Sequence, residues 1–290
     1  MESQATARDD SRTTSIHYEE AKPLIGARVQ ATRADMADPD FVRECLNLLD
    51  ERIVLVFPEI GLSEAEQLTF TDLLGERYNF VKQLVAEENS DIYKITLDPN
   101  LNTSPEYVLG TFFWHMDGVM EEFPPSKASL LSCIRPSAKG GQTEFSNLFA
   151  AYEHLPEEEK AALEGLTVLH SVYSAVRPVL ELDVTPESFQ GIKKQQEHPL
   201  VWNHANGRKS LLVGTHADRV TQLSLAEGRA LLLRLLEWAG QREFTYRHDW
   251  SQGDFVVWNN CGSLHRVVPY DRNSGRMMHR TSVAGNDPIQ

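Results

Sequence analysis

The fold of this chain is decided near its end, where residues 244–283 read FTYRHDWSQGDFVVWNNCGSLHRVVPYDRNSGRMMHRTSV. Residues 244–248, 255–258 and 276–283 are rich in β-branched, aromatic and other apolar residues, a composition typical of strands. No stretch between them has the apolar period of a helix. We therefore expect the chain to finish with three strands that no helix separates.

Further strands are expected upstream, again as short apolar runs. They lie at residues 53–57, 92–97, 111–116, 129–134, 142–145, 167–172, 200–202 and 211–213. Asn206-Gly207 between the last two runs predicts a tight hairpin. Helices are expected around residues 41–49 and after two capping boxes, Ser63 with Glu66 and Ser224 with Glu227.

Many short strands and few helices predict a mainly β fold with flanking helices, most simply a jelly roll. Strands do not alternate regularly with helices, and no glycine-rich loop opens a helix, which disfavours a doubly wound nucleotide-binding fold. We expect residues 1–15 to be disordered because they are polar, and residues 16–290 to form one domain.

Composition narrows the class of protein. The 28 basic and 42 acidic residues give a net charge of −14, which disfavours binding to nucleic acid or to anionic membranes. We find neither a signal peptide at the start nor an apolar run long enough to span a membrane. The three cysteines, Cys45, Cys133 and Cys261, are scattered and odd in number, so we expect reduced thiols and a cytoplasmic location.

Four residues carry the chemistry. Trp114-His115-Met116-Asp117 places an imidazole and a carboxylate two residues apart at the end of an expected strand, on one face and roughly 6–7 Å apart. A second imidazole, His265, comes late in the chain, and Arg276 follows it by eleven residues. Two imidazoles and one carboxylate can hold an oxygen-activating ferrous ion and leave positions open for an organic acid and O2. The arginine would supply a cation for that acid.

Plainer interpretations stay open for each feature. A His-x-Asp pair occurs by chance in many chains, and the aromatic residues before it could simply be core. Arg276 and Arg280 alternate onto one strand face about 13 Å apart, where they could be surface ion-pair partners. Rival ligands are available among the remaining histidines: His170, His198, His204 and His216. We expect these four to be structural or exposed.

The chain resembles the taurine/2,4-dichlorophenoxyacetate dioxygenase family of Fe(II)- and 2-oxoglutarate-dependent enzymes. The resemblance runs from Pro23 to Gly285. It is carried by the Trp-His-x-Asp step, Gly140-Gly141-Gln142-Thr143 with Ala150-Ala151-Tyr152, His198-Pro199-Leu200-Val201, and His265 with Arg276-Met-Met-His-Arg280. One departure is Trp258-Asn259-Asn260, where members often have Trp-Asp-Asn.

The resemblance implies a double-stranded β-helix with His115, Asp117 and His265 as iron ligands. It implies that Arg276 pairs with the distal carboxylate of 2-oxoglutarate and that Thr143 hydrogen-bonds the same group. The implied reaction consumes O2, releases succinate and CO2, and removes hydrogen from an unactivated C–H bond. Because Asp117 is retained, halogenation is not expected.

The primary substrate is expected to be a small molecule with an apolar body and one carboxylate or sulfonate. Tyr78, Met116 and Phe123 would form the apolar part of its pocket, and Arg280, with Lys82, its anionic end. The segment at 171–197 is long enough to form a lid. The alternative function is a metal-binding jelly-roll protein that senses or binds without turnover. We also expect a homo-oligomer, since symmetric assembly is common.

Overall fold

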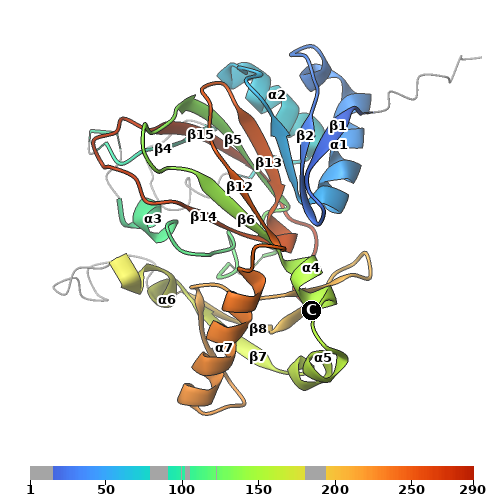
Figure 1. The fold of residues 1–290 in the computed structure, drawn as a ribbon, viewed down its shortest axis with the longest axis vertical. Helices are drawn as coiled ribbons and strands as arrows, with labels where there is room; N and C mark the ends of the chain where they lie inside the picture. Colours follow the sequence, from blue (N-terminus) through green and yellow to red (C-terminus); the bar gives the residue numbers. More distant parts are fainter. Residues whose placement is uncertain (1–15, 79–90, 99, 102–104, 122, 180–193) are drawn as a thin grey trace, which may run out of the picture.

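The structure is a computed structural model and describes residues 16–78, 91–98, 100–101, 105–121, 123–179 and 194–290. Two β-sheets dominate its upper part in Figure 1. The larger sheet has seven strands, in the order β1 (Tyr18–Lys22), β2 (Ile25–Val29), β3 (Val54–Phe57), β13 (Phe255–Asn259), β5 (Ala128–Arg135), β15 (Met277–Val283) and β4 (Tyr93–Ile95). The smaller sheet has the order β12 (Thr245–His248), β6 (Thr143–Asn147) and β14 (Ser263–Val267).

Alternation along the central strands separates two hydrophobic layers, because successive side chains of a strand point to opposite faces. Val54, Val56 and Trp258 belong to the cluster that Phe145 of the smaller sheet joins, so this layer lies between the sheets. Leu55 and Val257 belong to a second cluster, shared with helices α1 (Pro39–Arg52) and α2 (Glu64–Leu74). These helices therefore cover the outer face of the large sheet (Figure 1).

The lower part of the molecule in Figure 1 joins small sheets to helices. One sheet has the order β11 (Ala217–Val220), β7 (Thr167–Ser171) and β8 (Gln195–Pro199), and the other pairs β10 (Lys209–Leu211) with β9 (Val201–Asn203). The helices there are α4 (Leu148–Glu153), α5 (Glu157–Leu163), α6 (Val172–Val176) and α7 (Leu225–Ala239). The 3-10 helix η3 (Arg177–Val179) directly follows α6, and the other short elements are α3 (Pro105–Gly110), η1 (Asp35–Ala37) and η4 (Asn260–Gly262).

The predicted fold class, mainly β with flanking helices in a jelly roll, is confirmed. Both predicted capping boxes are present, at Ser63 before α2 and at Ser224 before α7. One predicted strand is wrong: residues 111–116 form turns, and only His115 makes an isolated bridge. The expected disordered segment at 1–15 lies outside the described residues.

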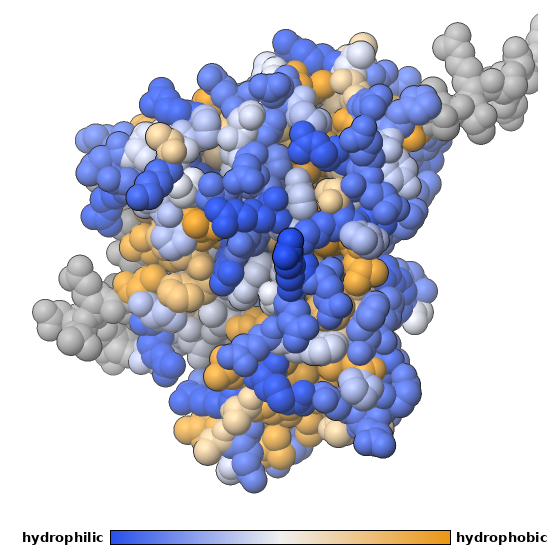
Figure 2. All heavy atoms as spheres, in the orientation of Figure 1, coloured by the Kyte–Doolittle hydropathy of each residue, from blue (hydrophilic) through white to orange (hydrophobic). Residues whose placement is uncertain are grey.

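Among the described residues, the longest apolar helices are too short or too polar to cross a bilayer. The face seen in Figure 2 is largely hydrophilic, with hydrophobic side chains gathered mainly in its lower half. The exposed Leu225 and Leu233 of α7 are examples of large apolar residues on the surface.

Candidate active site

Backbone pairing brings the two candidate histidine ligands together. The His115 amide donates to the His265 carbonyl at 3.1 Å, and the His265 amide donates back at 2.9 Å. The imidazole rings lie with their centroids 4.1 Å apart. His115 Nδ1 lies 2.8 Å from the Phe113 carbonyl, which can only accept, so Nδ1 carries the proton. The lone pair of His115 Nε2 is therefore free to bind a metal ion.

Asp117 is held beside these rings by three side chains. Its backbone amide donates to Asn260 Oδ1 at 3.0 Å, and its carbonyl accepts from Asn260 Nδ2 at 3.0 Å. Its carboxylate Oδ2 accepts from Arg280 Nη2 at 2.5 Å and from Ser129 Oγ at 3.2 Å. Burial opposes the charge on Asp117, but the neighbouring Arg280 guanidinium and the imidazoles outweigh it and lower the pKa of this carboxyl.

The three side chains form a cluster suited to a metal ion. Asp117 Oδ1 lies 4.0 Å from His115 Nε2, and Asp117 Oδ2 lies 3.5 Å from His265 Nε2. Within the described part of the chain, these are the one set of His, Cys, Asp or Glu residues whose ligand atoms all lie within 4.8 Å of one another. Two imidazoles and one carboxylate are the donor set of non-haem Fe(II) oxygenases, and they leave coordination positions open.

A buried arginine, Arg276, immediately precedes β15. Arg276 is 2% exposed, and its guanidinium stacks over the Tyr270 ring at 4.9 Å. Its Nε and Nη2 are buried with no hydrogen-bond partner among the described residues. A guanidinium stays protonated in proteins, so unpaired buried donors of this kind call for an anion.

Because Gly141 has no side chain, it leaves room for the Arg276 side chain. A Cβ at Gly141 would lie 3.1 Å from both Cδ and Nε of Arg276, and the glycine has a φ of +80°. Two residues later, Thr143 Oγ1 accepts a hydrogen bond from Trp250 Nε1 at 2.9 Å. Since that bond uses a lone pair of the oxygen, the Thr143 hydroxyl proton is left to donate to another acceptor.

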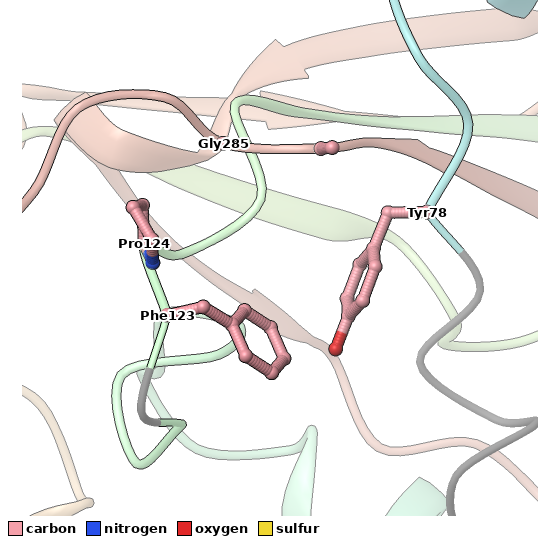
Figure 3. Close-up of a pocket in the computed structure, with 5 residues that line it drawn as sticks. Tyr78, Phe123, Pro124 and Gly285 are labelled. Carbon is pink, nitrogen blue, oxygen red and sulfur yellow. The ribbon is translucent and has the colours of Figure 1, made fainter.

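A cavity of about 360 Å³ lies beside Tyr78, which directly precedes the gap in the described residues. Its lining includes Tyr78, Phe123, Pro124 and Gly285, and Figure 3 shows the Tyr78 and Phe123 rings side by side. The ring centroids of Tyr78 and Phe123 are 5.4 Å apart. The Tyr78 hydroxyl is buried without a hydrogen-bond partner among the described residues.

The charges around Tyr78 place the cavity beside Arg280. Burial and the nearby Glu121 carboxylate raise the pKa of Tyr78 to about 12, and the positive charge of Arg280 acts on it in the opposite direction. The Tyr78 amide also donates to the Ser282 carbonyl at 2.8 Å, two residues beyond Arg280 on β15. The phenol of Tyr78 is therefore neutral at physiological pH.

Comparison with known proteins agrees with this arrangement. Residues 17–282 match the family described as taurine catabolism dioxygenase TauD, TfdA family. The chain belongs to this family. It is 37% identical over 254 residues to the alpha-ketoglutarate-dependent 2,4-dichlorophenoxyacetate dioxygenase of Cupriavidus pinatubonensis, a match covering 83% of this chain and 88% of that one.

A second relative is the (S)-phenoxypropionate/alpha-ketoglutarate-dioxygenase of Sphingobium herbicidovorans, 31% identical with 81% of this chain and 83% of the relative covered. Among solved structures, that of AAD-2 in complex with Mn(II) and N-oxalylglycine is 31% identical, with a TM-score of 0.79. That match covers 95% of this chain and 100% of the solved one. Both relatives are named as alpha-ketoglutarate-dependent dioxygenases, and this chain is an oxidoreductase of that class.

Of the residues predicted to bind substrate in this TauD, TfdA family member, some line the cavity and others do not. Tyr78 and Phe123 line the cavity. Met116 does not: it is 2% exposed and packs in the lower hydrophobic cluster with Trp114 and Val119. Lys82 and most of the expected lid, residues 180–193, lie outside the described residues.

The four rival histidines, His170, His198, His204 and His216, are each hydrogen-bonded, and none of them joins the metal cluster in the described structure. Sequence reasoning missed Asn260, which grips both backbone groups of Asp117, and Trp250, which orients Thr143. The family departure at Asn259 lies away from His265: its side chain contacts Asp50 and the Gly262 amide instead. A hint of Asn260 was visible in the Trp-Asn-Asn motif, but its contact with Asp117 spans 143 residues.

Proposed function

We propose that His115, Asp117 and His265 hold Fe(II) in an oxygenase that uses 2-oxoglutarate and O2. The donor set and its spacing support the metal. The observation that carries the co-substrate is Arg276, whose buried and unpaired guanidinium donors would receive the distal carboxylate of 2-oxoglutarate. Thr143, whose hydroxyl is turned by Trp250, would donate to the same carboxylate.

Bound Fe(II), with 2-oxoglutarate and O2, would supply an oxidant able to remove hydrogen from an unactivated C–H bond, with release of succinate and CO2. The protein contributes position. Asn260 and Ser129 orient Asp117, and the backbone bridge between His115 and His265 brings their two imidazoles together.

The primary substrate that fits best is a small carboxylate or sulfonate with an aryl or alkyl body. Arg280 would bind the acid group. Its side-chain hydrogen bonds within the described structure, to Asp117 and Ser129, both use Nη2, and a guanidinium has five N–H donors. Tyr78 and Phe123 would pack against the apolar body. Two relatives are named for 2,4-dichlorophenoxyacetate and (S)-phenoxypropionate, which supports an aryloxyalkanoate as the substrate of this chain.

Matched acid and amide pairs test the substrate class. With Fe(II), 2-oxoglutarate and O2, phenoxyacetate should stimulate succinate formation, whereas phenoxyacetamide, of nearly the same shape but uncharged, should not. Arg280→Gln should reduce kcat/KM for phenoxyacetate by about a hundredfold or more, since a charge-assisted pair is lost. If amides couple to turnover as well as acids do, the anionic end of the pocket is wrong.

The same assay separates the alternative function. A metal-binding jelly-roll protein without turnover would bind Fe(II) and 2-oxoglutarate but release no succinate with any substrate. We also propose a homo-oligomer in the cytoplasm. Light scattering during gel filtration measures the assembly, and cell fractionation measures the location.

A further inference from the structure

Three histidines outside the candidate metal cluster lie close to one another, next to the backbone of residues 116–119. His170 is on β7, His198 is on β8, and His216 immediately precedes β11. His170 and His216 are 0% and 1% exposed. The ring of His170 lies 4.9 Å from that of His216 and 5.7 Å from that of His198, centroid to centroid. Because they are buried, neither His170 nor His216 can reach a substrate.

The hydrogen bonds fix where the protons of His216 and His170 lie. The Met116 amide can only donate, and it donates to His216 Nε2 at 3.3 Å, so Nε2 carries a lone pair. His216 Nδ1 then carries the ring proton and donates to His170 Nδ1, 2.8 Å away. Both imidazoles are therefore neutral, and burial favours the same state because it lowers the pKa of each ring.

His198 contacts the same stretch of backbone three residues further on, at Val119. Its Nε2 lies 2.9 Å from the Val119 carbonyl, which only accepts, so Nε2 donates. Met116 and Val119 stand on either side of Asp117, and His115 precedes Met116. The rings of His216 and His198 thus contact the backbone that carries two of the three candidate metal ligands, and the His170 ring contacts both of these rings.

The turn at residues 214–215 allows His216 to contact the Met116 amide. A Cβ at Gly214 would lie 2.7 Å from His216 Nε2, and Gly214 has a φ of +145°. The next residue, Thr215, donates both its amide and its hydroxyl to the Trp114 carbonyl, at 2.8 and 3.1 Å. Residues 214–216 therefore bind the chain on both sides of His115.

We propose that His216, whose Nδ1 proton is accepted by His170, and His198 are positioning residues that hold the 115–119 backbone so that His115 and Asp117 converge on the metal ion. The inference rests on the proposed metal site. Partners beyond the ligands commonly change metal affinity by about 10–100-fold when removed. His216 differs from most such partners because it acts on a backbone amide between two ligands rather than on a ligand side chain.

Substitutions at His216 test the position of the acceptor atom. Gln places its amide oxygen near the site of Nε2, whereas Asn reaches only to the site of Nδ1 and Leu offers no acceptor. The control is His204→Leu: His204 is also buried and bonded through both ring nitrogens, to Asp287 and Ser210, but it lies on the link between β9 and β10. Binding of Co(II) alone, without co-substrate or turnover, is followed by its visible absorption, with melting temperature measured in parallel.

We expect His216→Gln to bind Co(II) within about threefold of the unsubstituted protein, and His216→Leu and His216→Asn to bind about 10–100-fold more weakly. His204→Leu should lower the melting temperature and leave Co(II) affinity unchanged. Equal affinities for the Gln, Asn and Leu variants, or an equal loss in His204→Leu, would overturn the positioning role while the metal site stands. If the unsubstituted protein itself binds no Co(II), the proposed metal site is wrong and the inference falls with it.

Discussion

At the scale of single residues, the site depends on two glycines, Gly140 and Gly141, as well as on its charged side chains. Gly140 and Gly141 precede a strand, so they do not form a phosphate cradle at a helix start. A Cβ at Gly140 would meet the Pro269 carbonyl oxygen at 2.1 Å, and one at Gly141 would press on Arg276. The pair lets the backbone of residues 140–141 pass close to the guanidinium and to the chain that leads into it.

Gly141→Ala should therefore weaken 2-oxoglutarate binding. Both the φ of +80° and the 3.1 Å contact with Arg276 oppose the added methyl group, and an arginine displaced by several tenths of an ångström loses bond geometry. We expect the KM for 2-oxoglutarate to rise about tenfold or more, measured by succinate formation. Gly207→Ala is the matched control, with a φ of +82° and open space around it. It should cost stability only, and an equal rise in KM in the control would contradict the role given to Gly141.

Residue types and spacing were enough to propose the ligands, because His, Asp and Arg carry their chemistry wherever the chain puts them. The residues that support them could not be found in this way. Asn260 acts through backbone groups 143 positions away, and Trp250 acts through a hydroxyl 107 positions away. Nothing in the local sequence distinguishes such an asparagine or tryptophan from one in an ordinary turn or core.

At the scale of elements, local signals decided how well the fold was predicted. The capping boxes of α2 and α7 were found because Ser and Glu lie three residues apart. Strand β1, with the sequence YEEAK, was missed because it is a largely exposed edge strand without apolar alternation. Residues 111–116 look like a strand, yet tertiary contacts rather than a ladder hold them, so their aromatic content misled the prediction.

The connection between β12 and β13 carries a prediction about acid stability. Asp254 is buried and accepts from His248 Nε2 at 3.0 Å and from the amides of Ser251 and Glu59 at 2.8 and 2.9 Å. Burial opposes its charge, but these bonds outweigh burial and lower the pKa of Asp254. The stabilisation is thus present above the unfolded pKa of about 3.9 and is lost as the pH falls through the lower folded value.

Asp254→Asn should lower the free energy of unfolding at pH 5 by about 2 kcal/mol, the range for hydrogen bonds to a charged group. The difference from the unsubstituted protein should shrink as the pH falls to 3. Urea unfolding at half-unit steps from pH 5 to pH 3 measures it. The control is Asp249→Asn, whose side chain is 77% exposed in the same connection and should change little. A difference that stays constant or grows toward pH 3 would contradict the sign.

At the scale of the whole molecule, the site requires both sheets. His265 lies on β14 of the smaller sheet, while Arg280 lies on β15 of the larger sheet and Asp117 lies in the connection that precedes β5. No short stretch of sequence encodes this approach, which comes from packing the layer that Phe145 and Trp258 share between the sheets. The site therefore forms only when the two sheets pack, and ligands that bind it should stabilise the entire fold.

The coupling of ligand binding to folding gives a prediction that distinguishes the metal site from the 2-oxoglutarate site. A ligand that binds the folded state at a hundred times its Kd adds about 2.7 kcal/mol to the free energy of unfolding. For a chain of this size we expect a rise in melting temperature of about 5 °C for saturating Mn(II), and a further rise when 2-oxoglutarate is added. Arg276→Gln should keep the Mn(II) increment and lose the 2-oxoglutarate increment, because the metal ligands stay while the buried cation is gone. Asp117→Ala should lose the Mn(II) increment, and scanning calorimetry measures both. Should Arg276→Gln retain the full 2-oxoglutarate increment, the co-substrate carboxylate binds elsewhere and the unpaired guanidinium serves another anion.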